Sequence, residues 1–481
     1  MAVATSTGKK RPHSAVVSIG LALFLAFVGL GAFLSERRTS VVGFDRPVVT
    51  TIFYHDRILT LSLVRGQGWW KTLHNRMLEI PADPLDQAIA AYGAALSTIS
   101  GDAERADRVA LEGRRAIALA VAGRKSEADA ALSRLARLQP SGEQIARIIA
   151  FALAGGSQPT TPADLQVAIS SLTVDSLDQR DWTTDQLRMA FFGRTREPTA
   201  AKAVMVDLQK RAERLAMRAD VLAFVLVFVG CSALVFLTIA ISRGASPFQP
   251  FGESILPPPW SMLTGLEVVL RVTVGAILGS VLAGVLSQAL GLKLDILGWT
   301  VAVVAALYFG RKSLSSPHGL TVASAFGLSL PSRGKLLVAS TLVLIVLEQG
   351  IAWMSDALLS ELSTSSSWTE LVDEDLLRGD LLTIVSGVAI GVVMAPIAEE
   401  ITYRSILFGS LRTRLGALSA AMISAAVFAL AHVYSLEGTA YVFVSAVVSA
   451  LVYERTRSLV PCIVAHAVNN AFAAGSNLLL R

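Results

Sequence analysis

Two adjacent carboxylates and an arginine lie inside the long apolar C-terminal part of this chain. Glu399, Glu400 and Arg404 follow the uncharged run Leu381–Ile397. A charge at the centre of a bilayer costs about 2.5–3.5 kcal/mol on insertion scales, so membrane proteins seldom keep one without a use. These residues are therefore the first candidates for chemistry.

Two histidines and an asparagine follow on later apolar runs. His432 lies four residues after Phe428, and His466 lies four residues before Asn470. Residues four apart share one face of a helix, so the Phe428 ring can help to exclude water beside the imidazole of His432. A carboxylate, two imidazoles and a carboxamide at one point can activate a water and stabilise an oxyanion.

Helix geometry separates the roles of the two glutamates. Glu400 and Arg404 stack on one face, where an ion pair offsets the cost of burial. Glu399 is turned about 100° away and can face the bundle interior as a general base. A polar packing network between helices would explain any one of these residues alone. The whole set, in order along residues 399–470, favours catalysis.

The position of the first motif within its helix is a further prediction. At about 1.5 Å per residue, Glu399 lies near the cytoplasmic end of the run Leu381–Ile397, and His432 lies near the opposite end of the next run. They meet if the first helix continues past Arg404 toward Leu411, or if the helices tilt or the loop dips inward. The motif is therefore predicted to lie mid-helix.

The composition is that of a polytopic helical membrane protein. The chain has 481 residues, of which 53% are hydrophobic and 16% charged, and its mean hydropathy is +0.56. The formal charge of +5 is small, and no basic cluster is interleaved with aromatic residues, so we expect no nucleic-acid partner. Cys231 and Cys462 both fall in apolar runs and are expected to be core residues.

The first apolar run, Ser14–Leu34, follows the basic residues 9–11 and is long enough to cross a hydrocarbon core of about 30 Å. A cleavable signal peptide has the same pattern. Because the charged residues 36–38 follow in place of a small-residue cleavage site, an uncleaved anchor is favoured. Residues 1–34 are predicted to form a cytoplasmic tail and the first transmembrane anchor.

Later apolar runs predict an all-α bundle of about eight to nine spans, two of the runs being short. Residues 221–335 are predicted to carry the spans before the core, and residues 336–481 the catalytic core. The runs are Val221–Ile241, Leu263–Leu290, Ile296–Phe309, Leu336–Met354, Leu381–Ile397, Ala417–Val433, Ala440–Val452 and Leu459–Leu479.

Residues 35–220 are charged, rich in alanine and arginine, and predicted to form an inserted soluble α-helical domain. Residues 123–140 have apolar residues at helical spacing and end at Pro140, like the second helix of a tetratricopeptide unit, and residues 86–97 offer a similar helix upstream. No clean 34-residue repeat is present. A tetratricopeptide-like domain and a helical spacer of no repeat class both stay open.

Basic loops fall on one side of the membrane if nine spans alternate, and the acidic Asp356–Asp380 loop falls on the other. Basic loops stay in the cytoplasm. The pattern predicts a multi-pass plasma (inner) membrane protein of bacterial type, with residues 35–220 outside the cytoplasm. The basic residues are Lys9, Lys10, Arg11, Arg243, Arg311, Lys312, Arg333, Lys335, Arg404, Arg412, Arg414, Arg455 and Arg457.

Three other charges in apolar runs have plain explanations. Glu267 and Arg271 are four residues apart and are expected to pair on one helix. Glu348 is expected to face an interface or a cavity. We predict structural roles for all three.

The three motifs in combination resemble the CPBP family, the CAAX-protease and bacteriocin-processing intramembrane endopeptidases. They are Glu-Glu-x-x-x-Arg from Glu399, Phe-x-x-x-His from Phe428 and His-x-x-x-Asn from His466. The resemblance covers residues 336–481. The chain has Tyr403-Arg404-Ser405 where family members often have Phe-Arg-Gly, a departure that affects packing and removes no catalytic group.

The resemblance implies a role for each site residue. Glu399 would activate the water, assisted by His432. His466 and Asn470 would polarise or hold the scissile carbonyl and its oxyanion. The supporting residues would be Glu400, Arg404 and Phe428.

The sequence leaves open whether the site binds a metal ion. The chain has no His-Glu-x-x-His motif. Glu399, His432 and His466 would be the ligands if zinc is bound, with a water in the open position. Because Asn470 is a poor zinc ligand and a good oxyanion donor, a glutamate-type mechanism with no cofactor is favoured.

The predicted function is an intramembrane endopeptidase acting on a membrane-associated protein or peptide in the bilayer. Residues 35–220 would present substrate or dock a partner. One alternative is a non-catalytic immunity or scaffold protein of the same fold, against which the complete site argues. The other is a transporter with Glu399, Glu400 and His432 as a proton relay. No inverted repeat or matched pair of broken helices supports it.

Overall fold

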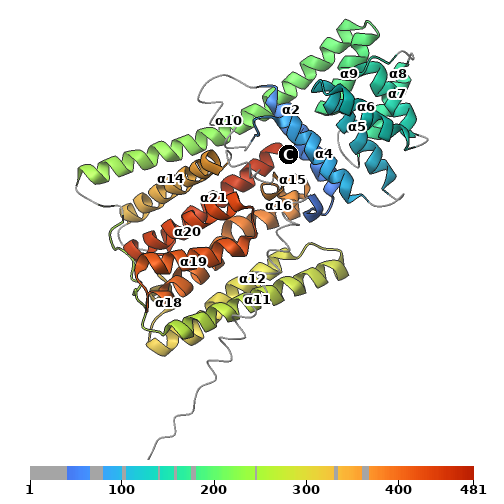
Figure 1. The fold of residues 1–481 in the computed structure, drawn as a ribbon. Helices are drawn as coiled ribbons and strands as arrows, with labels where there is room; N and C mark the ends of the chain where they lie inside the picture. The colour runs from blue at the N-terminus through green and yellow to red at the C-terminus, as the bar shows by residue number, and fades with distance from the viewer. Residues whose placement is uncertain are drawn as a thin grey trace, which may run out of the picture. The chain divides into compact units, whose positions relative to one another are not determined.

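A computed structural model describes residues 41–64, 80–99, 104–138, 141–156, 160–174, 180–243, 246, 248–329, 334–359 and 368–481. Regular structure in these residues is helical throughout, without a strand (Figure 1). The predicted all-α class is confirmed. The anchor predicted within residues 1–34 lies outside the described residues.

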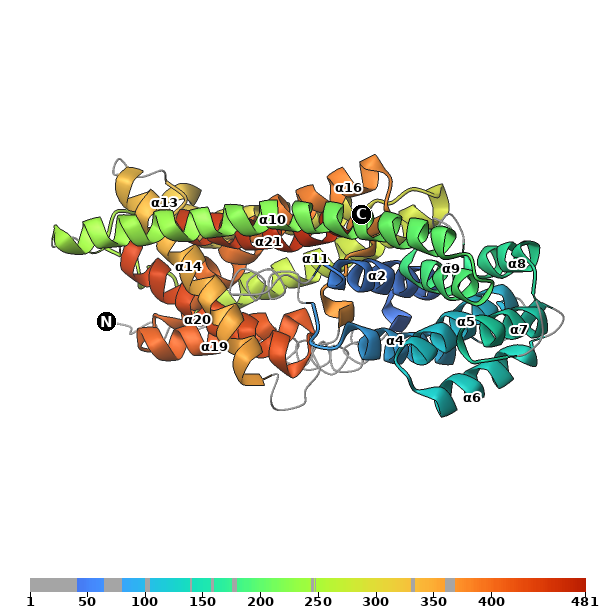
Figure 2. The same ribbon diagram turned by 90° about the horizontal axis from the view of Figure 1, so that it is seen from above.

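The chain forms two compact units. The membrane unit includes residues 227–370 and 378–474. The helical unit includes the described parts of residues 37–226, together with residues 371–377 and 475–481. The 45-residue helix α10, Pro198–Ser242, belongs to both and runs through the boundary predicted at residue 220 (Figure 2).

Side-chain caps and prolines begin the helices of the helical unit. Asp83, Thr161 and Asp181 each accept a hydrogen bond from a backbone N–H in the first turn that follows them. The helices expected at residues 86–97 and 123–140 are present as α4 and α6. In the described residues, the α-helices before α10 are α2 (Pro47–Ser62), α4 (Pro84–Thr98), α5 (Arg105–Val121), α6 (Lys125–Ala136), α7 (Ser141–Leu153), α8 (Pro162–Leu172) and α9 (Trp182–Arg194).

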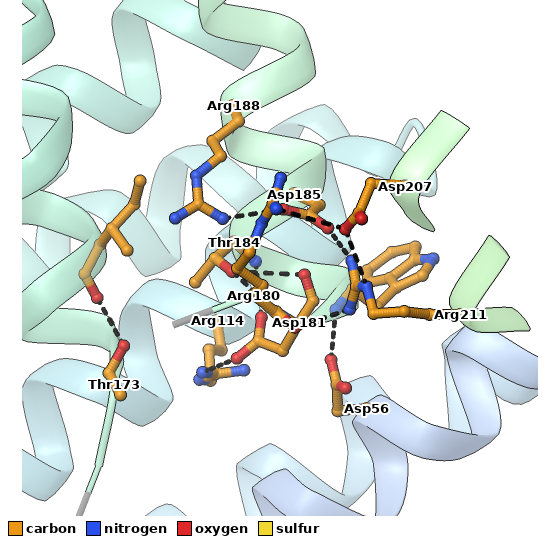
Figure 3. A network of polar contacts seen from close by, with 12 residues as sticks. Asp56, Arg114, Thr173, Arg180, Asp181, Thr184, Asp185, Arg188, Asp207 and Arg211 are labelled. Carbon is orange, nitrogen blue, oxygen red and sulfur yellow. Dashed lines mark hydrogen bonds and ion pairs between the residues drawn. The ribbon is translucent and has the colours of Figure 1, made fainter. Parts of the chain in front are cut away.

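A buried polar network joins α2, α5 and α9 (Figure 3). The fully buried Arg114 donates from Nε to the Leu172 carbonyl oxygen at 2.9 Å and forms an ion pair with Asp181. The Oδ1 atom of Asp56 accepts from the Trp182 backbone N–H at 2.5 Å. Because a buried charge costs several kcal/mol unless it is paired, these contacts hold the three helices in one arrangement.

Burial shifts the pKa values of two neighbouring groups of α2 in opposite directions. It raises the pKa of Asp56 to about 7, helped by the nearby Asp181 carboxylate and opposed by Arg114. It lowers the pKa of His55 to about 3. The His55 ring lies edge to face with the rings of Tyr54 and Tyr92, with centroids 5.1 and 6.1 Å away.

Among the described residues, five helices are long and apolar enough to cross a membrane. They are Pro198–Ala240, Met262–Leu290, Gly334–Ser355, Leu381–Leu411 and Leu436–Thr456. Other predicted runs coincide with α12 (Asp295–Gly310), α19 (Ala417–His432) and α21 (Val460–Leu480). The short run at residues 440–452 is the middle of the 21-residue helix α20, Leu436–Thr456.

The helix that carries the first motif is continuous from Leu381 to Leu411. The prediction that Glu399 lies mid-helix is confirmed. Hydropathy ends this helix too early, because it counts the charges of Glu400 and Arg404 and takes no account of their burial. The two residues are only 1% and 4% exposed. The segments of this helix are α16 (Leu381–Val388), η6 (Ala389–Met394), α17 (Ala395–Glu399), η7 (Glu400–Phe408) and α18 (Gly409–Leu411).

Two of these segments, η6 and η7, are π-helical. Pro396 follows η6 and has no N–H to continue the α-helical hydrogen bonds, which a wider turn accommodates. π-Helical turns occur often at functional sites, and here they lie on both sides of Glu399.

Close packing holds this helix against α11, Met262–Leu290. Trp260 donates from Nε1 to the Ser410 hydroxyl at 3.0 Å. A methyl group at Gly265 would lie 1.7 Å from the same oxygen, so only glycine permits the approach. Figure 1 shows α14 (Gly334–Leu359), α19, α20 and α21 lying side by side in the membrane unit.

Candidate active site

His466 of α21 lies between the two glutamates of the helix Leu381–Leu411. Its Nδ1 atom is 3.0 Å from Oε1 of Glu400, and its Nε2 atom is 3.6 Å from Oε2 of Glu399. A carboxylate therefore faces each ring nitrogen. The structure brings together the first and third sequence motifs, which are more than sixty residues apart.

Glu400 and Arg404 form the ion pair expected from their spacing. The Arg404 Nε atom lies 3.3 Å from Oε2 of Glu400. The guanidinium carbon also lies 4.0 Å from the centre of the Phe428 ring, an arrangement in which a cation is attracted to the ring face. Since both charged groups are buried, the pair and the ring together compensate for their lost hydration.

The two glutamates differ in exposure. The Glu399 side chain is 18% exposed and that of His466 is 15% exposed, whereas the Glu400 side chain is 1% exposed. Glu399 and His466 can therefore contact a water or a peptide, while Glu400 holds His466 from behind.

The ring of Phe428 of α19 packs against both imidazoles. Its ring centre is 4.5 Å from that of His432 and 6.2 Å from that of His466, both edge to face. The Nδ1 atom of His432 lies 2.8 Å from the carbonyl oxygen of Phe428. A hydrogen on Nδ1 satisfies this contact and makes Nε2 a hydrogen-bond acceptor.

Asn470 also contacts the helix that carries Glu399. Its Nδ2 atom donates to the Gly391 carbonyl oxygen in η6 at 2.8 Å. One N–H of the carboxamide is therefore bound to main chain, and one is left for a substrate oxygen. The neighbouring Asn469 faces α14, where its Oδ1 atom accepts from Gln349 at 2.8 Å.

Two further residues belong to the surroundings of the site. Glu348 of α14, for which we predicted only a structural role at an interface or cavity, is 6% exposed and interacts electrostatically with His466, Glu400 and Arg404. Tyr403 packs its ring edge to face against Phe428 at 4.9 Å. Its position next to Arg404 was visible in the sequence, but nothing there indicated the contact.

The zinc alternative requires Glu399, His432 and His466 around one ion. In the part of the chain that the structure describes, no group of three or more His, Cys, Asp or Glu side chains is placed to hold a metal ion.

Residues 381–472 match the family model of the type II CAAX prenyl endopeptidase Rce1-like proteins. The predicted resemblance is confirmed for this segment, which contains all three motifs and starts later than the residue 336 that we expected. No curated protein and no solved structure gives a significant match. The apolar helices and the family match together indicate a multi-pass membrane protein.

Proposed function

We propose that this protein is an intramembrane endopeptidase that hydrolyses a peptide bond of a membrane-associated protein or peptide. The observation that carries the proposal is the partly exposed pair of Glu399 and His466, whose Oε2 and Nε2 atoms lie 3.6 Å apart above the buried Glu400. A single water can hydrogen bond to both atoms. The segment that matches the protease family contains this pair.

Glu399 is the general base in this mechanism. Its carboxylate takes a proton from the water, which His432 orients through Nε2, and the oxygen attacks the scissile carbonyl carbon. His466 has a carboxylate at each ring nitrogen and is suited to carry hydrogen on both, so that Nε2 donates to the developing oxyanion together with Asn470. The C–N bond then breaks, and Glu399 returns the proton to the leaving amine.

The proposed mechanism uses no metal. Support comes from the donor set, because Asn470 is a poor zinc ligand and the chain has no His-Glu-x-x-His motif. Zinc content and chelator sensitivity test this part of the proposal. Full cleavage by metal-free protein is the expected result, and cleavage that returns only when Zn²⁺ is added would overturn it.

The proposed topology is that of a bacterial plasma (inner) membrane protein with eight to nine spans and residues 35–220 outside the cytoplasm. The alternating basic loops support it. The helical unit would present substrate or dock a partner, either as tetratricopeptide-like hairpins or as helices of no repeat class. A membrane-anchored bacterial precursor suits an external domain, and a prenylated CAAX peptide is the substrate that the family's name offers.

The test is cleavage by the full chain in lipid nanodiscs. Quenched fluorescent peptides are supplied in two sets, one prenylated and ending in CAAX, the other anchored by an apolar helix. Glu399→Gln is expected to lower the cleavage rate by about 10²- to 10⁴-fold. Glu267→Gln is the control, because Glu267 is also a membrane-helix glutamate in an i,i+4 pair, with Arg271.

Equal cleavage by wild type and Glu399→Gln would refute the catalytic assignment. Absence of cleavage in wild type, with proton-coupled uptake into vesicles that Glu399→Gln abolishes, would favour a transporter instead. Absence of both would favour the scaffold alternative.

A further inference from the structure

Asn477, near the end of α21, binds main chain with both ends of its carboxamide. Its Oδ1 atom accepts from the Asp373 N–H at 3.0 Å, and its Nδ2 atom donates to the Leu371 carbonyl oxygen at 2.9 Å. The side chain is buried. Rotation or sliding of α21 would break both hydrogen bonds and leave buried polar groups unpaired. The two hydrogen bonds therefore fix α21 at Asn477.

The fixed point lies on the helix face that carries the site. Asn470 and Asn477 are seven residues apart, and His466 and Asn477 are eleven apart, close to two and three full turns. The three side chains therefore project from one face of a single continuous helix. The orientation of α21 at Asn477 determines the direction in which His466 and Asn470 point.

The segment that Asn477 binds, Leu371–Leu377, also holds the beginning of α2. The Oε2 atom of Glu374 accepts from the Asp45 N–H at 2.8 Å, and its Oε1 atom accepts from the Thr50 hydroxyl at 2.8 Å. A carboxylate is favourable at a helix N-terminus. The buried side chains of Leu376 and Leu377 fix the segment in place.

We propose that Asn477 is a positioning residue for His466 and Asn470, and that the segment Leu371–Leu377 couples α2 of the helical unit to these side chains. The proposal rests on the proposed function and adds regulation to it. A partner that binds the helical unit and shifts α2 moves Glu374 and, with it, the main chain at Asp373. This movement changes the orientation of α21.

Two neighbouring threonines of α2 provide a matched test. Thr50 and Thr51 are both fully buried. The Thr50 hydroxyl donates to Glu374, whereas the Thr51 hydroxyl donates at 2.6 Å to the Pro47 carbonyl oxygen of its own helix. Valine in place of either threonine removes the hydroxyl and keeps the shape, but only Thr50→Val breaks the contact with the segment.

The activity measurement is kcat and KM of the full chain in nanodiscs with the quenched peptides. Thr50→Val and Asn477→Leu are expected to lower kcat about 3- to 10-fold with KM unchanged, as loss of one or two orienting hydrogen bonds implies. Thr51→Val is expected to keep the wild-type kcat. A purely structural role for Thr50 would lower stability equally in both valine variants and leave kcat of the folded protein unchanged.

Hydrogen exchange of α21 is the second measurement and needs no substrate. Exchange of residues 463–474 is expected to become about 10-fold faster in Thr50→Val and Asn477→Leu, and to stay at the wild-type rate in Thr51→Val. The same exchange in both threonine variants would overturn the coupling. If wild type cleaves no peptide, the proposed function fails, and the exchange result still decides whether α2 is coupled to α21.

Discussion

The Nδ1 atom of His466 lies 3.0 Å from Oε1 of Glu400, so one imidazole joins α21 to the helix that carries both glutamates. The other oxygen of the same carboxylate faces Arg404. Glu400 thus organises the site from a buried position. Glu399, one residue earlier, has a partly exposed side chain, as the proposed general base requires.

This division predicts different effects for the two glutamates on stability. Glu400→Gln leaves the buried Arg404 without its carboxylate and is expected to cost about 3–5 kcal/mol, as loss of one partner of a buried ion pair does. Glu399→Gln is expected to cost no more than about 1 kcal/mol. Thermal unfolding in nanodiscs measures both. Equal unfolding temperatures for the two variants would contradict the division.

Substitutions of the adjacent residues Asn469 and Asn470 of α21 can distinguish stabilisation of an oxyanion from helix packing. Asn470→Leu is expected to lower kcat about 10²- to 10³-fold with little change in KM, because it removes a donor to the oxyanion. Asn469→Leu breaks the hydrogen bond to Gln349 and is expected to cost about 1 kcal/mol of stability while kcat stays within about 3-fold of wild type. Steady-state kinetics of both variants provide the measurement, and a similar kcat for the two would argue against the oxyanion role.

The local features of the site were predictable because helix geometry alone determines them. The spacing of Glu400 and Arg404 leads directly to their ion pair. The extension of the first helix toward Leu411 followed from the need for the motifs to meet. The ion pair depends on residues of one helix only, and the helix extension depends also on the place of His432 in the next apolar run.

The contacts between distant segments were not predictable in the same way. The position of His466 between two carboxylates, the approach of Glu348 to the site and the binding of Asn477 to residues 371–377 all depend on how helices pack. A single sequence contains no measure of that packing. The continuation of α10 through the boundary predicted at residue 220 was missed for a related reason, because a change in hydropathy does not end a helix.

The close contact of α11 with the helix Leu381–Leu411 predicts that one added methyl group lowers stability. Gly265→Ala would place its Cβ 1.7 Å from the Ser410 oxygen, and we expect a loss of about 1–3 kcal/mol as the helices separate. Gly284→Ala on the same helix meets nothing within 4 Å and is expected to be neutral or slightly stabilising. Thermal unfolding compares the two. A neutral Gly265→Ala would show that the two helices are less closely packed.

Asp56 and His55 are predicted to make opposing pH-dependent contributions to the stability of the helical unit. The pKa of Asp56 is raised to about 7 from its ordinary 3.8, so the stability it contributes is complete below pH 3.8 and is lost as the pH rises toward 7. The pKa of His55 is lowered to about 3 from its ordinary 6.5, so its contribution is complete above pH 6.5 and is lost as the pH falls toward 3.

Between pH 4 and 6.5 the two groups change the free energy of unfolding in opposite directions, each by up to about 1.4 kcal/mol per pH unit. The two changes largely cancel in wild type. Asp56→Asn keeps the acceptor for the Trp182 N–H but removes the titration. Its stability is therefore expected to fall steeply below pH 6.5, while the exposed control Asp129→Asn follows wild type. Hydrogen exchange of α2 and α9 against pH measures the difference. An unchanged pH profile in Asp56→Asn would mean that Asp56 and His55 do not titrate as their burial requires.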